Sequence, residues 1–350
     1  MECISLLNDA CRKTLEQAIT EGSEPTDGIM LPAHIAPLPR AVITNLVNMT
    51  KAETAYIAMS ALIGNLVSSS DMHDILGQTM KNDFQLEAGD TPHVYVPVSP
   101  MSPAALAYET ALNFSLSLIR YYVSRSASQY NYRVVITHSD ALEVRYTPIN
   151  ESDNINIIFL TPNTQTAHKD KRIKIITTDN YRSCASLYKG LMTDRDFCLQ
   201  NHIVPGAADN TAGVLALVSH LFTTVQQIHR KEPLARYTTV IIDGCFPQLY
   251  VAATIASRMG LPIKPVLSAS SSPHTPFYPM RLLEKCDGEI ISDAREISAI
   301  LQNASHHRPV ILIDRNAYEA KRPDNNTGGS ASPHQVSVRH LQALKKALLS

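Results

Sequence analysis

Residues 243–263 read DGCFPQLYVAATIASRMGLPI, and this stretch carries the clearest structural signal in the chain. Gly244 follows an apolar run and favours a turn, and Pro247 fits the first turn of a helix, where its missing N–H costs nothing. Gly260 is typical of the position that ends a helix. The stretch therefore predicts a strand, a turn and a helix from about Pro247 to Met259. A loop that enters a helix in this way presents backbone N–H groups to an anion such as a phosphate.

Short β-branched runs alternate with helical stretches along most of the chain after His93. Such alternation is typical of an α/β protein whose mostly parallel sheets are covered by helices on both faces. Two further helices have clear beginnings, at Ser102-Pro103 and near Asp209. The predicted strands are Val94 to Val98, Val134 to Thr137, Ile155 to Leu160, Ile173 to Ile176, Thr238 to Ile242, Pro265 to Leu267 and Val310 to Ile313.

The part of the chain before His93 is predicted to be mainly helical, with a turn-rich segment from Glu21 to Pro39. We expect an N-terminal helical segment over residues 1–90, a smaller α/β domain over 91–200 and a larger α/β domain over 201–350. The clearest loop runs from Lys321 to Pro333. The predicted N-terminal helices are Leu6 to Ile19, Arg40 to Val47, Ala52 to Leu66 and Met72 to Met80.

Overall charge favours neither nucleic acid nor an anionic membrane as a partner. The chain has 350 residues, of which 31 are basic and 32 acidic, and 44% are apolar. No apolar run approaches the ~18 residues that span a bilayer. The basic run Lys169-Asp170-Lys171-Arg172 has no interleaved aromatic residues to stack bases, so we interpret it as a solvated loop. We expect no nucleic-acid partner and no membrane partner.

The cysteines and histidines favour neither a disulfide framework nor a metal site. The six cysteines form no CxxC pair, which predicts reduced thiols and a cytoplasmic or other reducing intracellular compartment. Charged residues within Met1 to Leu15 argue against a secretory signal. None of the 13 histidines is paired at ligand spacing on a helix, and His306 and His307 are expected to point to opposite sides of an extended segment. We expect no metal.

Several stretches resemble threonine synthases, and they do so in family order. The end of the stretch quoted above is similar to the family's "GNFGxxxAGxxAKKMGLPI", which enters a helix at the cofactor phosphate. Glu21 to Pro32 resembles the family's "EGLAPDGGLYVP", and Asn201 to Phe222 resembles "NSINWARILAQ". The resemblance implies two doubly wound, mostly parallel-sheet domains of the fold type II pyridoxal-phosphate kind. It covers most of the chain and is faint between these anchors.

The same comparison places Tyr108 where the family has the lysine that binds pyridoxal phosphate. Pro103 to Phe114 matches the family's "GPTLAFKDVALQF" without a gap. A phenol cannot form an imine with an aldehyde, so neither the Schiff base nor lysine-mediated proton transfer is available at that position. No lysine occurs from Asn82 to His168 that could substitute for it nearby.

Two other family features are damaged. The second glycine of the phosphate loop is replaced by Pro247, which has no N–H. The family's "TSGDTG" clasps the substrate carboxylate, and the matching Thr137 to Leu142 keeps Asp140 but neither glycine. The residues assigned to a remnant cofactor or ligand pocket are Gly244, Cys245, Phe246, Pro247, Asp140, Ser139 and Asn210.

These departures favour a threonine-synthase-like pseudoenzyme that serves as a structural or protein-binding component. Function resides in the site and not in the fold, so the fold can be kept when the site is lost. It is expected to bind no cofactor and to associate with protein partners or with itself as a homo-oligomer. One alternative is an active pyridoxal-phosphate lyase acting on a phosphorylated hydroxy amino acid, with Lys264 or Lys285 nearest the phosphate loop. Another is a sensor that binds a metabolite non-covalently.

Overall fold

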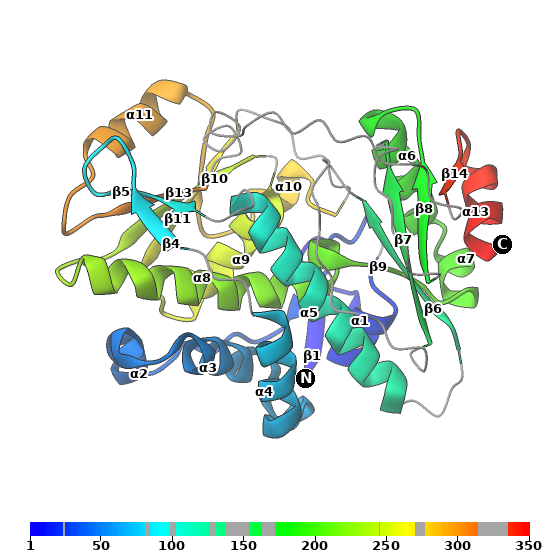
Figure 1. Ribbon diagram of the computed structural model, residues 1–350, viewed down its shortest axis with the longest axis horizontal. Helices are drawn as coiled ribbons and strands as arrows, with labels where there is room; N and C mark the ends of the chain where they lie inside the picture. Colours follow the sequence, from blue (N-terminus) through cyan, green and yellow to red (C-terminus); the bar gives the residue numbers. More distant parts are fainter. Residues whose placement is uncertain are drawn as a thin grey trace.

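A computed structural model shows two large β-sheets side by side, with the long helix α5 (Pro103–Arg125) running diagonally between them (Figure 1). The structure describes residues 1–23, 25–80, 85–98, 103–125, 130–137, 154–162, 172–244, 246–269, 277–313 and 335–350.

The larger sheet has six strands in the order β12-β11-β10-β13-β5-β4. Neighbouring strands pair in parallel except β4, which runs antiparallel at the edge. The strands are β4 (Gln85–Ala88), β5 (Val94–Val98), β10 (Thr238–Asp243), β11 (Ile263–Ser268), β12 (Glu289–Ile291) and β13 (Val310–Ile313).

The smaller sheet has five strands in the order β14-β8-β7-β6-β9, and every neighbouring pair is parallel. Its strands are β6 (Tyr132–Thr137), β7 (Ile155–Thr161), β8 (Ile173–Thr177), β9 (Ile203–Pro205) and β14 (Gln335–Ser337).

The central strands are buried on both faces, which explains why they read as nearly continuous apolar runs. All residues of β10 up to Ile242 are buried, and in β7 only Asn156 is partly exposed. Helices cover both faces of a parallel sheet, so the side chains on both faces of its strands are apolar. The predicted α/β class with two mostly parallel sheets is confirmed, and all seven predicted strands are present.

The helix α8 (Thr211–Lys231) has 17 buried residues among its 21, lies beneath the larger sheet in Figure 1 and packs against α3, α5 and α9. Asn210 caps its N-terminus, one residue after the predicted beginning near Asp209. The other helices along this half of the chain are α6 (Tyr181–Thr193), α7 (Arg195–Gln200), η3 (Ala207–Asp209), α10 (Met280–Leu283), α11 (Ala294–Gln302) and α13 (Leu341–Leu349).

The helix predicted from Pro247 is α9 (Pro247–Arg258), and its end is built as the sequence indicates. Gly260 has φ +93°, a left-handed conformation that glycine adopts without strain. The Gly260 N–H donates to the Ser257 carbonyl, and the Leu261 N–H donates to the Ala256 carbonyl. These two bonds make a Schellman motif, which satisfies the last carbonyls of the helix.

The prediction of a helix from Leu6 to Ile19 is wrong. This region forms β1 (Glu2–Ser5) and β2 (Arg12–Thr14), which join β3 (Met30–Pro32) in an antiparallel sheet in the order β2-β1-β3. The helix α1 (Leu15–Thr20) starts only where Thr14 and Gln17 form a capping box. Strands of three or four residues are too short to show a period of two in the sequence.

The remaining N-terminal helices are close to their predicted positions. They are α2 (Arg40–Asn45), α3 (Lys51–Ile63) and α4 (Ser69–Thr79), with the short turns η1 (Leu46–Asn48) and η2 (Gly64–Leu66) between them.

Sheet membership crosses the expected domain boundaries. The strands β4 and β5 precede the predicted smaller domain or open it, yet both belong to the larger sheet. The strands β9 and β14 lie after residue 200 and belong to the smaller sheet. Each sheet is therefore assembled from segments that are distant in sequence.

Two other expectations concern membrane-spanning helices and disulfides. No helix within the described ranges is both long enough and apolar enough to cross a membrane. No disulfide joins any of the five cysteines in the described part of the chain, which are Cys3, Cys11, Cys184, Cys198 and Cys286.

A buried histidine on α8 makes stability depend on pH. Burial, with a smaller effect of the Lys51 charge, lowers the pKa of His220 from its ordinary value of 6.5 to about 3. Above pH 6.5 the imidazole is neutral in both states, and its contribution to stability is fully present. As the pH falls from 6.5 toward 3, the unfolded chain takes up a proton that the folded chain does not, so stability is lost.

We expect His220→Gln to flatten the acid side of the stability profile by up to about 1.4 kcal/mol per pH unit. Urea unfolding measured between about pH 7 and pH 5 tests this. The exposed His340→Gln is the control and should leave the slope unchanged. Equal slopes in His220→Gln and the parent chain would mean that His220 titrates normally in the folded state.

Candidate functional site

The phenol of Tyr108 ties the first turns of α5 to the end of a strand in the smaller sheet. Its hydroxyl donates a hydrogen bond to the backbone carbonyl of Thr137, at 2.8 Å. Thr137 is the last residue of β6 and the first residue of the stretch predicted to resemble a substrate nest. The carboxyl ends of parallel strands are where such folds place ligands. Tyr108 is partly buried and packs on the core there.

Three tyrosines gather around the buried Asp209, and we call Tyr108, Tyr188 and Tyr278 the tyrosine cluster. They come from α5, from α6 and from the segment before α10. Tyr188 and Tyr278 are fully buried, and the Tyr278 hydroxyl donates to the Ala208 carbonyl at 2.5 Å. Asp209 is 7% exposed. The cluster therefore fills the space beside η3 with aromatic rings.

The phenols of this cluster stay protonated at neutral pH. Burial raises the pKa of Tyr108 well above its usual value, and the Asp209 carboxylate raises it further. The same two causes, in the same order, raise the pKa of Tyr188 and of Tyr278. Neutral phenols can donate hydrogen bonds but cannot act as nucleophiles without a base to take the proton.

A glutamine connects the tyrosine cluster to the helix of the predicted phosphate loop. The Gln248 amide donates to an Asp209 carboxylate oxygen at 3.3 Å, and both side chains are buried. Gln248 is the second residue of α9. The Asp209 carboxylate therefore lies near Tyr108 and is bonded to the start of α9.

Two backbone N–H groups at the predicted phosphate loop are bonded within the chain. The Phe246 N–H donates to the Asp243 carbonyl at 2.9 Å, and the Leu249 N–H donates to the Phe246 carbonyl at 3.2 Å. Pro247, the first residue of α9, has no N–H. Phe246 is 6% exposed and Gly244 is buried. These amides are therefore not offered to an anion.

Asn210 was predicted to belong to the remnant pocket, and its amide is used by the fold. The side chain is fully buried, and its nitrogen donates to the carbonyls of Ile19 at 2.9 Å and Pro205 at 3.0 Å. Its oxygen accepts from the Ala212 N–H at 2.9 Å and caps α8. These bonds join α1, β9 and α8, so Asn210 has a structural role in the site region.

Three other predicted site residues, Ser139, Asp140 and Cys245, lie outside the described residues. The same holds for the predicted loop from Lys321 to Pro333 and for Lys169, Asp170 and Lys171 of the basic run. Arg172, the last residue of that run, is described, as is Lys174.

Both lysines considered as replacements are engaged at the surface. Lys264 Nζ lies 2.6 Å from a Glu289 carboxylate oxygen, and its side chain is 52% exposed. Lys264 is the second residue of β11, near the amino end of that strand, whereas the tyrosine cluster lies at the carboxyl ends. Lys285 Nζ donates to the Leu6 carbonyl at 3.1 Å. Each of the two amines therefore has a partner of its own.

Sequence reasoning missed Asp209, Tyr188 and Tyr278 as site residues. Asp209 is a charged residue directly before a helix cap in an otherwise apolar run, which is a usable signal. Tyr188 lies within an ordinary amphipathic helix, and Tyr278 follows a stretch without periodicity. Only the folded arrangement places these two rings beside α5.

No family model matches the sequence. Solved structures share its fold. The crystal structure of threonine synthase from Escherichia coli matches with a TM-score of 0.75 and 13% identity, over 100% of this chain and 99% of that one. Threonine synthase from Brucella melitensis, solved with pyridoxal phosphate bound, gives 0.63 and 16%, over 99% and 90%. Yeast threonine synthase gives 0.61 and 19%, over 76% and 58%. The chain has the fold of threonine synthases.

The described residues at Tyr108 and at Phe246 and Pro247 do not fit a covalently held pyridoxal phosphate. Such a cofactor needs an amine for its aldehyde and donors for its phosphate. Tyr108 offers a phenol whose hydroxyl is bonded to Thr137, and the loop at Phe246 and Pro247 offers no free N–H at either residue. We therefore derive no reaction step through this group.

Proposed function

We propose that this chain is a threonine-synthase-like pseudoenzyme, which keeps the fold, has lost the Schiff-base lysine and serves as a structural or protein-binding component. The observation that carries the proposal is Tyr108, which stands at the family's lysine position in the sequence. It faces the carboxyl end of β6, where it is bonded to Thr137. A phenol there cannot supply the imine chemistry of the family.

The surroundings of Tyr108 support the same proposal. Two fully buried tyrosines and a buried glutamine occupy the space around Asp209. Protein interiors are close-packed, so aromatic rings in this place exclude a ligand of comparable size. This favours the pseudoenzyme over a metabolite sensor that binds its ligand around Asp209.

The retained core supports a scaffold role. Most of α8 and α9 and the central strands of both sheets are buried. In contrast, a phenol stands at the family's lysine position. Selection on the fold or its surface preserves the buried core and permits changes in the site. We expect the partner to be another protein or a second copy of this chain.

The test is spectroscopic. We expect the purified chain, after incubation with pyridoxal phosphate and gel filtration, to show no visible absorption band of an internal aldimine. Borohydride reduction followed by peptide mass spectrometry should find no lysine that is stoichiometrically modified. A band that persists, with one modified lysine, would sink the proposal and support the active-lyase alternative.

Matched variants identify the amine if a band is found. Lys264→Arg and Lys285→Arg keep the positive charge but cannot form the imine under these conditions. Loss of the band in one of them would assign the Schiff base to that residue. The scaffold role is tested separately by size-exclusion chromatography of the native chain with associated proteins: a monomer without partners would contradict it.

A further inference from the structure

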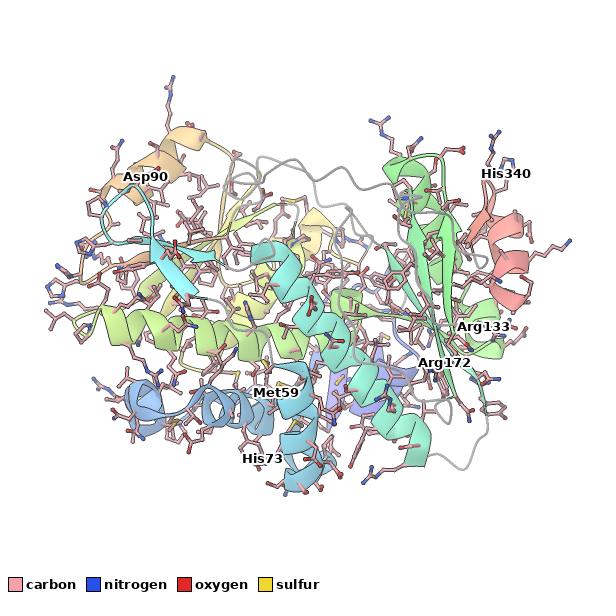
Figure 2. All side chains as sticks on the ribbon, viewed as in Figure 1. Met59, His73, Asp90, Arg133, Arg172 and His340 are labelled. Carbon is pink, nitrogen blue, oxygen red and sulfur yellow. The ribbon has the colours of Figure 1, made fainter. Side chains whose placement is uncertain are left out.

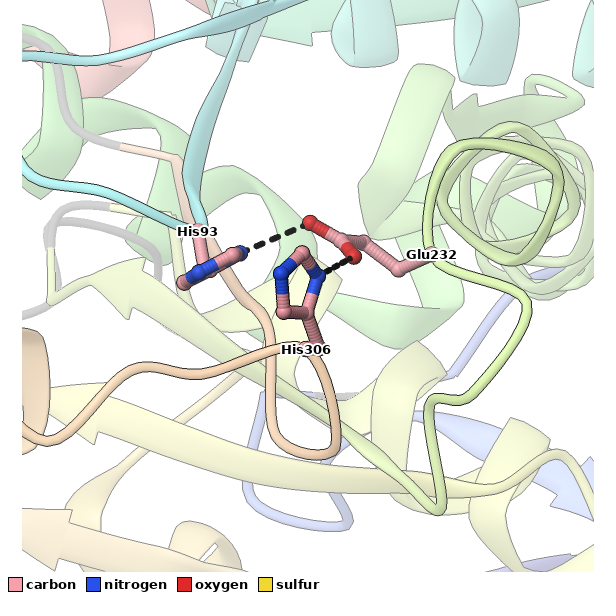
Figure 3. A group of neighbouring side chains, drawn as sticks. All are labelled: His93, Glu232 and His306. Atoms are coloured by element: carbon pink, nitrogen blue, oxygen red, sulfur yellow. Dashed lines mark hydrogen bonds and ion pairs between the residues drawn. The ribbon is translucent and has the colours of Figure 1, made fainter.

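Two histidines and a glutamate from three distant segments meet at one end of the larger sheet (Figure 3). His93 lies in the turn between β4 and β5, Glu232 directly follows α8, and His306 lies in the turn before β13. His93 Nδ1 is 2.9 Å from one Glu232 oxygen, and His306 Nδ1 is 2.6 Å from the other. One ligand-type atom from each residue lies within 4.8 Å of the others.

The glutamate is the fixed inner member of the group. Glu232 is 4% exposed, and the Tyr95 hydroxyl donates to its Oε1 atom at 2.5 Å. Its two oxygens also accept hydrogen bonds from the ring nitrogens of His93 and His306, so the position of the carboxylate is set by three neighbouring side chains.

The histidines form the outer side of the group. The His93 side chain is 23% exposed and that of His306 is 66% exposed, and their ring centroids are 4.0 Å apart. Solvent therefore reaches the group past His306. A metal ion can enter there, and a water molecule can complete its coordination.

The backbone at His93 is held in a conformation that favours glycine. His93 has φ +61°, in the left-handed region. The turn that holds it is fixed on both sides, since the Val94 N–H donates to the Thr91 carbonyl and the Val310 N–H donates to the His93 carbonyl. A residue that keeps a costly conformation is a reason to look for a function of its side chain.

We propose that His93, Glu232 and His306 form a binding site for a divalent transition-metal ion of the Zn²⁺ type. One ring nitrogen from each histidine and one carboxylate oxygen are the donors that Zn²⁺ accepts at about 2.0–2.2 Å. Tetrahedral ligands at that distance are roughly 3.4 Å apart, which side-chain rotations can reach from the present spacing. A neutral histidine binds a metal through its unprotonated ring nitrogen and keeps its proton on the other ring nitrogen. Metal binding to neutral histidines therefore releases no proton.

The proposed metal site and the tyrosine cluster lie at opposite ends of the parallel strands. His93 and His306 precede the amino ends of the parallel strands β5 and β13, while Tyr108 follows the carboxyl end of β5. Asp90, in the same turn as His93, and Arg133, on β6 of the smaller sheet, lie toward opposite ends of the molecule's long axis (Figure 2). The ion would therefore join three segments as a structural clip, independent of the proposed loss of catalysis.

The experiment compares two neighbouring histidines. The full chain is stripped of metal and titrated with Zn²⁺ in a calorimeter, with His306→Gln beside His307→Gln. His307 is exposed and bonds to the Leu234 carbonyl, outside the group. We expect His306→Gln to weaken one zinc site by more than about 10-fold, the lower end of what losing a partner of a metal ligand costs. His307→Gln should bind as the parent does.

A second variant guards against misfolding. His93→Gly suits φ +61° and relieves the backbone cost there, which offsets part of the lost bond to Glu232, so it should fold and also lose the site. Mg²⁺, which prefers oxygen donors in an octahedral site, should give no binding that depends on these residues. Equal zinc affinity in the parent chain, His306→Gln, His93→Gly and His307→Gln would overturn the proposal and leave a hydrogen-bonded latch only.

Discussion

Asn210→Ala is expected to lower the free energy of unfolding by about 3–6 kcal/mol, because it removes one cap and leaves two buried carbonyls without their donor. The Asn210 nitrogen serves Ile19 and Pro205, and its oxygen serves the Ala212 N–H. The residue is 0% exposed, so water cannot replace the amide without a local opening. Since the chain has no tryptophan, urea unfolding is followed by far-UV circular dichroism.

A second capping asparagine provides the control. Asn180 caps α6 through the Ser183 N–H at 2.9 Å and is exposed, so Asn180→Ala should cost only about 0.5–2 kcal/mol. Asn210→Asp should be at least as damaging as Asn210→Ala, because it turns a carboxylate oxygen toward two carbonyl oxygens. Equal losses in Asn210→Ala and Asn180→Ala would mean that the region adapts or hydrates, and would favour the ligand pocket.

The central strands could be predicted from sequence because their physical cause is local. A strand buried on both faces must be apolar and is enriched in β-branched residues, as in Thr238 to Ile242 and Ile155 to Leu160. The end of α9 was equally local, since Gly260 alone supplies the left-handed residue of its cap. Both predictions needed no knowledge of distant residues.

Most of the short strands could not be predicted in this way, although the four-residue strand β13 was. The strands β1, β2, β3, β4, β9, β12 and β14 have three or four residues each and depend on partners elsewhere in the chain. The apolar residues after Leu6 were read as part of a helix, although helical structure starts only after Thr14. Pairing partners, not periodicity, decide such segments.

The candidate site, too, could be predicted only in part. The family resemblance predicted a site that includes Tyr108 and the start of α9. In the structure, Asp209 lies near Tyr108 and accepts a hydrogen bond from Gln248. The group of His93, Glu232 and His306 could not be predicted from the sequence for a different reason. Glu232 is separated from His93 by 139 residues and from His306 by 74, so no ligand spacing on one helix could reveal it.

A close backbone contact holds the segment that carries Asp209. Gly213, in the first turn of α8, faces Ala207 so closely that a Cβ atom would lie 1.9 Å from the Ala207 oxygen and 2.5 Å from its carbonyl carbon. Ala207 itself has φ +49°, a conformation that alanine rarely adopts. The glycine is what allows η3 and α8 to meet at this distance.

We expect Gly213→Ala to destabilise the chain by more than about 3 kcal/mol, beyond the usual range of overpacking, because both contacting atoms belong to the backbone and cannot rotate away. Gly77→Ala is the matched control, since Gly77 is an exposed glycine within α4 with nothing near its Cβ position. There the same substitution should stabilise the chain by about 0.5–1 kcal/mol through helix propensity. Thermal and urea unfolding of both variants measure the difference. Gly213→Ala as stable as the parent chain would mean that η3 moves easily, in which case the tyrosine cluster could open to admit a ligand.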